Sequence, residues 1–210
     1  MIPASDALER LRQGNRRFVA ERAQRGSGQT AGRRAEIADG QEPFAIIFGC
    51  SDSRVPAELV FDQGLGDLFV IRVAGNIVAP SLVGSVEFAA EQFHTRLVVV
   101  LGHTQCGAVT ATLEQLRRPA SGQSKNLKSI VDLISPAVKD LVNPDGTPYD
   151  ESMVSRAVRA NVRASADHLR RGSPVLEQLI QTSGLLVVGA EYSLETGVVD
   201  FFDGVPGASR

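Results

Sequence analysis

The chain has 210 residues and a formal net charge of −2 at pH 7. This length is typical of one domain and is sufficient to bury a hydrophobic core without disulfide bonds. The balanced charge argues against a general nucleic-acid binder, and no apolar run approaches the roughly 20 residues that a membrane helix needs.

The first predicted element is a helix near the amino end, where apolar residues recur every three or four positions between Ala4 and Val19. Ser5 and Asp6 are candidate capping residues. The polar, glycine-bearing stretch at 22–34 is predicted to be a loop, and residues 1–40 together form an arginine-rich helical arm. Because no aromatic residues are interleaved with the arginines, a solvated helix face docked on a partner subunit is favoured over a nucleic-acid surface.

From residue 44 onward, short apolar runs alternate with helix-like segments. Strands are expected at 44–48, 68–73, 97–101 and 185–188, with a fifth at 198–202 on an edge. Helices are expected at 56–61, 81–93, 106–117, 126–141, 149–171 and 174–182. The helix at 149–171 is amphipathic and carries five arginines, so it is interpreted as an outer or subunit-contact helix.

Short, continuous apolar strands that alternate with helices are typical of a parallel sheet buried on both faces. We therefore expect an α/β fold with a mainly parallel sheet in the order 2-1-3-4, a fifth strand on an edge, and flanking helices. The whole chain is interpreted as one domain, with the sheet core at 41–202 and a tail at 203–210.

Two segments directly follow predicted buried strands: GCSDSR at 49–54 and GHTQCG at 102–107. In the order 2-1-3-4 the two strands are neighbours, and their carboxyl ends form the switch point at which open α/β sheets bind ligands. We therefore expect Cys50, Asp52, His103 and Cys106 to converge. Thiolate, imidazole and carboxylate are the ligand types of tetrahedral zinc sites, and soft thiolates favour zinc over magnesium or calcium.

Other interpretations of this cluster stay open at this point. The cysteines could be core residues, a disulfide pair or a reactive thiol. Two cysteines are too few for a disulfide framework, and the amino end lacks the pattern of a secretory signal, so reduced thiols in the cytoplasm are expected. Asp52 could be a fourth metal ligand, or it could pair with Arg54 and leave one coordination position open.

The string from Cys50 to Val78, together with GSVEFA and VVVLGHTQCGAV, closely resembles the β-class carbonic anhydrases. The resemblance covers nearly the whole chain, and its paired C-x-D-x-R and H-x-x-C motifs are highly specific. It implies one Zn²⁺ per subunit on Cys50, His103 and Cys106, in a homodimer or homotetramer. It also implies that a dyad of Asp52 and Arg54 orients a zinc-bound hydroxide for reversible hydration of CO2 to bicarbonate and a proton.

The resemblance further implies a substrate pocket. Gln41 matches a glutamine that donates a hydrogen bond to substrate, and Phe69 matches an aromatic residue that lines the pocket across the dimer interface. The Gly107 N–H would face the substrate, and Ala74 would add an apolar wall. Phe88 takes the place of a plant-type tyrosine, so the ring is kept and the hydroxyl is lost.

Three other functions are weighed against CO2 hydration. A hydrolase of carbonyl sulfide or carbon disulfide on the same scaffold would need the same metal chemistry. A zinc-stabilised binding module would need the metal but no open coordination position. A thiol enzyme would use Cys50 as its nucleophile. Neither a membrane nor a nucleic-acid partner is expected.

Overall fold

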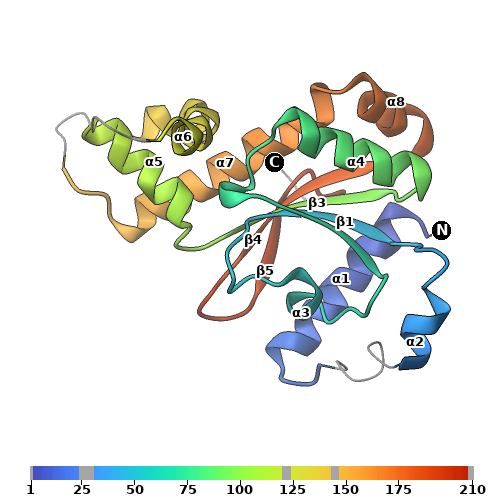
Figure 1. Ribbon diagram of the computed structural model, residues 1–210. Helices are drawn as coiled ribbons and strands as arrows, with labels where there is room; N and C mark the ends of the chain where they lie inside the picture. The colour runs from blue at the N-terminus through green and yellow to red at the C-terminus, as the bar shows by residue number, and fades with distance from the viewer. Residues whose placement is uncertain (1, 24–30, 120–123, 143–146, 208–210) are drawn as a thin grey trace.

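The computed structural model describes residues 2–23, 31–119, 124–142 and 147–207. The α/β fold is confirmed, with a five-stranded sheet in the order β2-β1-β3-β4-β5 (Figure 1). The strands are β1 (Ala45–Gly49), β2 (Leu68–Arg72), β3 (Leu97–His103), β4 (Leu186–Tyr192) and β5 (Val199–Asp203). The first four strands are parallel, and β5 lies at the edge, as expected, where it runs antiparallel to β4.

Helices cover both faces of this sheet, so the molecule has three layers. Figure 1 shows α1–α3 on one side and α4–α8 on the other. The helices are α1 (Ala4–Val19), α2 (Ala31–Glu36), α3 (Ala57–Val60), α4 (Pro80–Gln92), α5 (Gly107–Arg117), α6 (Lys125–Val138), α7 (Glu151–Arg171) and α8 (Pro174–Ser183). Two single 3₁₀ turns are η1 (Ala74–Asn76) and η2 (Lys139–Leu141).

The apolar run of β3 is continuous because both of its faces are buried. Leu97, Val99 and Leu101 point into the core beneath α1 and α3. Val98 and Val100 point into the opposite core, which α4, α7 and α8 cover. The alternation of side chains along one strand therefore supplies both cores.

Helix α1 packs on the sheet of its own chain. Its Ala7, Leu8 and Leu11 are buried in the core. The Asn15 side chain donates to the carbonyls of Val60 and Gly197 at 3.1 and 2.8 Å. Helix α1 thus buries its apolar face within its own chain, and docking of its solvated, arginine-bearing face on a partner subunit stays a prediction.

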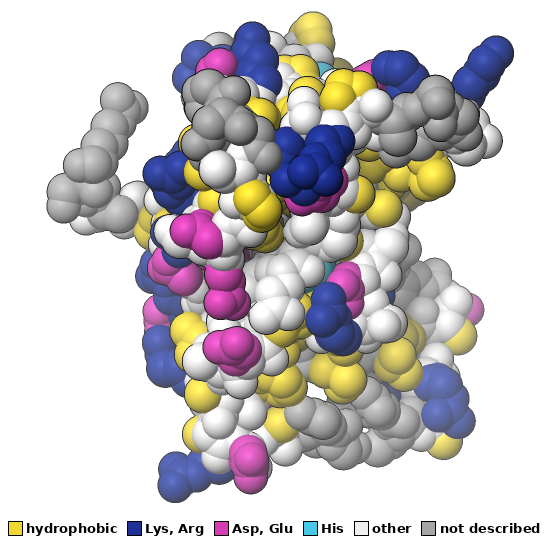
Figure 2. Space-filling model, turned by 90° about the vertical axis from the view of Figure 1, so that its left-hand side faces the viewer, with side chains coloured by type: hydrophobic (Ala, Val, Ile, Leu, Met, Phe, Trp, Pro, Cys, Tyr) yellow, Lys and Arg dark blue, Asp and Glu magenta, His cyan; other side chains and the backbone are white. Residues whose placement is uncertain are grey.

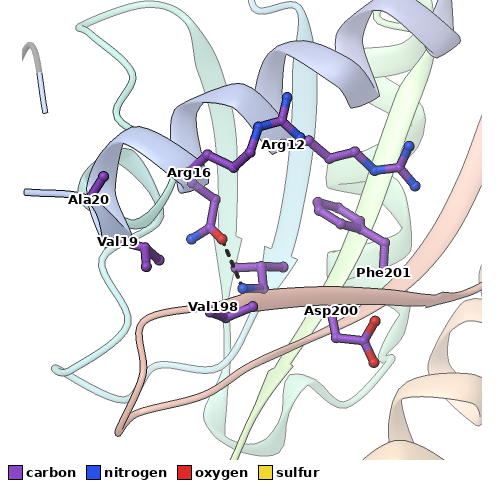
Figure 3. A pocket seen from close by; sticks show the side chains of 9 residues that line it. Arg12, Arg16, Val19, Ala20, Val198, Asp200 and Phe201 are labelled. Carbon is purple, nitrogen blue, oxygen red and sulfur yellow. Dashed lines mark hydrogen bonds between the residues drawn. The ribbon is translucent and has the colours of Figure 1, made fainter. Parts of the chain in front are cut away.

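A hollow of about 420 Å³ lies between α1 and β5 (Figure 3). Arg12 and Arg16 approach it from the helix, and Val198 and Phe201 line it from the strand side. The Arg12 guanidinium lies 5.5 Å from the centroid of the Phe201 ring, within the range of a cation–π contact. Arg12 thus has a local packing role, whereas Arg16 pairs with Glu9 on the helix surface.

The amino-terminal predictions need two corrections. Helix α1 follows Pro3 directly, so Ser5 and Asp6 lie within its first turn and no side chain caps it. The predicted loop at 22–34 is wrong at 31–34, which belong to α2; residues 24–30 lie outside the described ranges. The Ala, Arg and Glu residues of α2 favour a helix, and this preference outweighs the glycine that suggested a loop.

Strands β3 and β4 are longer than predicted. Gly102 pairs with Glu191 and His103 with Tyr192, so the ladder continues past the apolar runs. Strand β5 ends at Asp203, one residue beyond the predicted sheet core. These extensions place His103 inside the ladder, which fixes its backbone more firmly than a loop would.

Helix α7 covers the sheet over β3 and β4. Its Val158, Val162 and Leu169 are fully or almost fully buried. The interpretation as an outer helix is correct, and the apolar face is buried on the sheet of the same chain. Among the described residues, no helix is both long enough and apolar enough to cross a bilayer. On the face shown in Figure 2, basic and acidic side chains are interspersed, which is typical of a solvated surface.

Candidate metal and active site

Three predicted ligands come together at the carboxyl edge of the sheet. Cys50 directly follows β1, His103 is the last residue of β3, and Cys106 precedes the first turn of α5. Their ligand atoms all lie within 4.8 Å of one another, and all three residues are buried. The structure thus assembles two sulfurs and one imidazole nitrogen around a common point.

His103 is held in the orientation that a metal ligand needs. Its Nδ1 lies 2.9 Å from the Thr104 carbonyl, a distance at which Nδ1–H donates and the lone pair is left on Nε2. That Nε2 is buried and has no hydrogen-bond partner among the described residues. A buried polar atom without a partner is costly by about 1–3 kcal/mol. A metal ion bound to Nε2 would remove this cost.

The two thiols are not equivalent. Hydrogen bonding with Cys106 lowers the pKa of Cys50 to about 4, and the Gly75 N–H, 3.3 Å from Cys50 Sγ, acts in the same direction. The same contact with Cys50, together with burial, raises the pKa of Cys106. The two sulfurs and the imidazole nitrogen, all within 4.8 Å of one another, form a donor set that fits zinc.

Asp52 is held next to this cluster by Arg54. Arg54 Nε lies 2.9 Å from Asp52 Oδ1 and Arg54 Nη2 lies 2.8 Å from Oδ2, which is a two-pronged ion pair. The side-chain hydrogen bond from Arg54 keeps the pKa of Asp52 well below its usual range, so the carboxylate is ionised. Its Oδ2 is 3.8 Å from His103 Nε2, too far for a hydrogen bond but within reach of a group bound between them.

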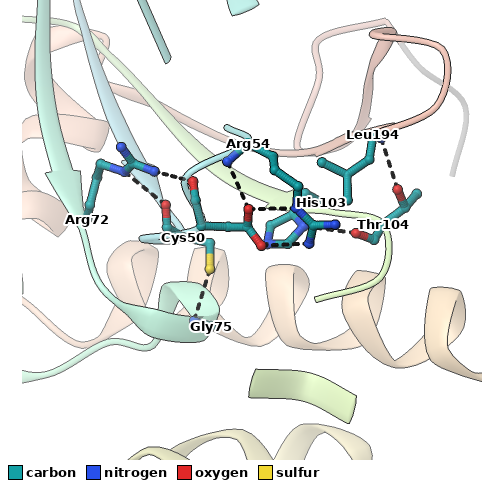
Figure 4. A network of polar contacts seen from close by, with 8 residues as sticks. Cys50, Arg54, Arg72, Gly75, His103, Thr104 and Leu194 are labelled. Carbon is teal, nitrogen blue, oxygen red and sulfur yellow. Dashed lines mark hydrogen bonds and ion pairs between the residues drawn. The ribbon is translucent and has the colours of Figure 1, made fainter. Parts of the chain in front are cut away.

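Arg72 supports the same loop from the neighbouring strand. Its guanidinium donates to the backbone carbonyls of Cys50, at 3.0 Å, and of Asp52. Figure 4 shows Arg72 to the left of Cys50, Gly75 below its sulfur, and Arg54 and His103 to its right. Both the ligand and the dyad carboxylate therefore extend from a backbone segment that β2 holds in place.

Three of the five residues expected in the substrate pocket do not lie at the cluster within one chain. Gln41 is exposed and precedes the amino end of β1, whereas Cys50 follows its carboxyl end. Phe69 pairs with Ile46 near the start of β2, and Phe88 on α4 is 51% exposed. The two rings lie 6.4 Å apart, and both contact Phe93.

The two small residues expected in the pocket do lie near the cluster. Gly107 opens α5 directly after Cys106 and is exposed, and Ala74 opens the turn η1 whose next residue donates to Cys50. The sequence interpretation missed the contributions of Gly75 and Thr104. Both act through backbone groups, so residue type alone carries no signal for Thr104. For Gly75, the Gly-Asn pair directly after a strand signals a tight turn.

Comparison with known proteins identifies the family. A family model described as carbonic anhydrase matches residues 45–199 of this chain. The chain belongs to the carbonic anhydrase family. Carbonic anhydrase 2 of Mycobacterium tuberculosis is 40% identical over 191 residues, which cover 91% of this chain and 89% of that protein. A carbonic anhydrase of Mycolicibacterium smegmatis is 38% identical over 194 residues, which cover 92% of this chain and 91% of that protein.

Solved carbonic anhydrases share the fold. The crystal structure of the β-carbonic anhydrase CafA of Aspergillus fumigatus matches with a TM-score of 0.73 at 25% identity, covering 96% of this chain and 91% of that one. The β-carbonic anhydrase CcaA matches with a TM-score of 0.71 at 26% identity, covering 94% and 95%. The resemblance to the β-class carbonic anhydrases is therefore confirmed, and the chain is an enzyme of this family.

Proposed function

We propose that this chain catalyses the reversible, zinc-dependent hydration of CO2 to bicarbonate and a proton. The observation that carries the proposal is the buried group of Cys50, His103 and Cys106, with an unpartnered His103 Nε2 and an ionised carboxylate beside it. Membership of the carbonic anhydrase family supports the same reaction.

Cys50, His103 and Cys106 would hold one zinc ion per chain. When bound, zinc supplies a Lewis acid that lowers the pKa of water to about 7, the value established for carbonic anhydrase with three histidine ligands. The chain contributes the donor set, and it fixes the imidazole through the Thr104 carbonyl. Because all three ligand residues are buried, the charge of the thiolates is poorly screened by solvent.

Asp52 would orient the nucleophile. Its Oδ2 can accept a hydrogen bond from an attacking oxygen that lies near His103 Nε2, which turns a lone pair of that oxygen toward CO2. Arg54 occupies both carboxylate oxygens from the opposite side and keeps Asp52 ionised. This pairing favours an accepting role for Asp52 over that of a fourth metal ligand. One coordination position is then left for the reaction, as catalytic zinc sites require.

The CO2 pocket would be completed by a second copy of the chain. Gln41 and Phe69 lie on parts of the chain away from Cys50, and the Phe88 ring is half exposed. A partner subunit in a dimer could bring these side chains to the metal site, as the family resemblance implies. Gly107 and Ala74 would come from the same chain as the metal, with the Gly107 N–H directed at the developing oxyanion.

The test is stopped-flow proton release after mixing CO2 with zinc-loaded protein between about pH 6.5 and 9. We expect rapid release that rises with pH, because a deprotonated nucleophile is required. Cys106→Ser should abolish the release, whereas Ala111→Ser, which adds the same side chain at an exposed position of α5, should not. A low, pH-independent rate with zinc fully bound would refute CO2 hydration. Turnover of CS2 under the same conditions would then indicate the hydrolase alternative.

A further inference from the structure

The turn that donates to Cys50 has an unusual backbone. Gly75 and Asn76 follow one another with φ values of +69° and +43°, both in the left-handed region. Asparagine adopts this region only at an energetic cost, so neighbouring groups must hold the turn. The direction of the Gly75 N–H toward Cys50 Sγ depends on this conformation.

Helix α7 holds the turn through two buried polar side chains. Asn161 Nδ2 donates to the Gly75 carbonyl at 2.8 Å, and Ser165 Oγ donates to the Asn76 carbonyl at 2.9 Å. Asn161 and Ser165 are 2% and 6% exposed. Because they are four residues apart, they lie on the same face of the helix. The two carbonyls belong to the peptide groups that follow the Gly75 N–H, so the side chains fix the left-handed turn rather than the N–H itself, and the turn then sets the direction of that N–H.

The same helix face also contacts the other half of the metal site. A Cβ at Gly102, the residue before His103, would lie 2.5 Å from Val162 Cγ2. Val162 lies between Asn161 and Ser165 in the sequence, so one turn of α7 contacts both β3 and the turn η1. Helix α7 therefore packs against the strand that ends in His103 and against the turn that contacts Cys50, while the pairing of β1 with β3 sets the register of the two ligand-bearing strands.

We propose that Asn161 and Ser165 are positioning residues of the metal centre. They keep the Gly75 N–H directed at Cys50 Sγ, and this hydrogen bond withdraws electron density from the ligating thiolate. The inference rests on the proposed metal-binding function. It assigns a role to the arginine-rich helix α7, which lies outside the two family motifs. Groups that hydrogen-bond directly to a metal ligand, as the Gly75 N–H does, typically change metal affinity or activity by about 10–100-fold when they are removed.

The test uses the full chain loaded with Co²⁺ in place of Zn²⁺, in which a sulfur-to-metal charge-transfer band reports directly on the thiolates. The variants are Asn161→Leu, Ser165→Ala and Ser165→Thr, and zinc affinity is measured in parallel by competition with a chromophoric chelator. Leu169→Ala is the matched control, because Leu169 is buried on the same helix but lies in the core cluster with α4 and α8.

We expect Asn161→Leu and Ser165→Ala to shift the charge-transfer band and to weaken zinc binding by up to about tenfold, because they act on the ligand through the turn. Ser165→Thr retains the hydroxyl and should have the same band as the wild type. Leu169→Ala should also leave the band unshifted. If Ser165→Ala leaves both readouts unchanged, or if Leu169→Ala shifts the band equally, the inference is wrong. Since Ser165→Ala removes a single hydroxyl, the test does not depend on whether Asn161→Leu folds. If the variants shift the band but the wild-type chain does not hydrate CO2, the proposed function is refuted and the positioning role stands.

Discussion

Gly75→Ala is the substitution that the structure predicts most sharply. Gly75 has a φ of +69°, and a Cβ added there would lie 2.8 Å from Ile134 Cδ1 and 3.0 Å from Ala108 Cβ. The added Cβ therefore lowers the stability of the folded chain in two independent ways. The first is the backbone strain of a left-handed alanine, and the second is the overlap with side chains of α6 and α5.

The two costs can be added. A left-handed conformation costs an alanine about 1–2 kcal/mol. Forcing an extra methyl group into a packed core costs about 1–3 kcal/mol. The expected loss of unfolding free energy is thus about 2–5 kcal/mol, and for a domain of this size each kcal/mol lowers Tm by about 2–4 °C. Gly75→Ala should therefore unfold about 4–20 °C below the wild type.

A second substitution separates the two costs. Ile134→Val removes the Cδ1 atom that the new Cβ would meet, and alone it should destabilise the chain by about 0.5–1.5 kcal/mol. In the double variant the overlap is relieved, so the combined loss should fall short of the sum by about 1 kcal/mol or more. Ile46→Val is the matched control, because Ile46 is fully buried in β1 and pairs with Phe69 and Val98.

The assay is thermal and urea unfolding of the four proteins in each cycle. If the losses of unfolding free energy are additive when Gly75→Ala is combined with Ile134→Val, as with Ile46→Val, the Gly75–Ile134 contact does not limit the site. The reasoning would then be refuted. A Gly75→Ala variant as stable as the wild type would refute it more directly.

Three further predictions concern the site itself. Asp52→Asn should lower kcat for CO2 hydration by about 10²–10³-fold with zinc content unchanged, because the amide cannot replace an ionised acceptor; an unchanged kcat would remove Asp52 from the mechanism. Mixing inactive Cys106→Ser with Gln41→Ala subunits should restore about a quarter of the wild-type activity if random dimers form and Gln41 acts across the interface. No recovery in such mixed dimers would place Gln41 in its own subunit's site. Removing metal with a chelator should lower Tm, and added Zn²⁺ should restore it, since an ion that binds only the folded state stabilises it; a Tm insensitive to both treatments would count against a zinc centre.

The strand order and the meeting of the two motifs could be predicted because both depend on local pattern. Continuous apolar runs identify buried parallel strands, and a switch point between β1 and β3 follows from the order 2-1-3-4. Cys50 and His103 then have to meet, whatever the details of the loops. The substrate residues could be named only through the family resemblance. One chain keeps Gln41 away from Cys50, at the other end of β1, so a second copy is needed to test that assignment.

The contribution of α7 could not be predicted in the same way. Asn161 and Ser165 are separated from the turn that they hold by 86 and 89 residues. Their spacing of three and four residues relative to Val158 and Leu169 puts them on the apolar face of the helix, so their burial follows from the periodicity. The carbonyls that they reach do not follow from it, because these depend on how α7 packs on the sheet and on the turn η1.

The orientation of the metal donors is set mainly by backbone groups outside the two motifs. The Thr104 carbonyl fixes the imidazole, the Gly75 N–H contacts the sulfur of Cys50, and Arg72 holds the carbonyls of Cys50 and Asp52. A backbone group cannot be deleted by substituting its own side chain. Its contribution can be tested only by moving the segment that carries it. This is why Gly75→Ala, which strains the turn from within, and Asn161→Leu, which releases it from outside, should weaken metal binding although neither residue offers a side-chain ligand.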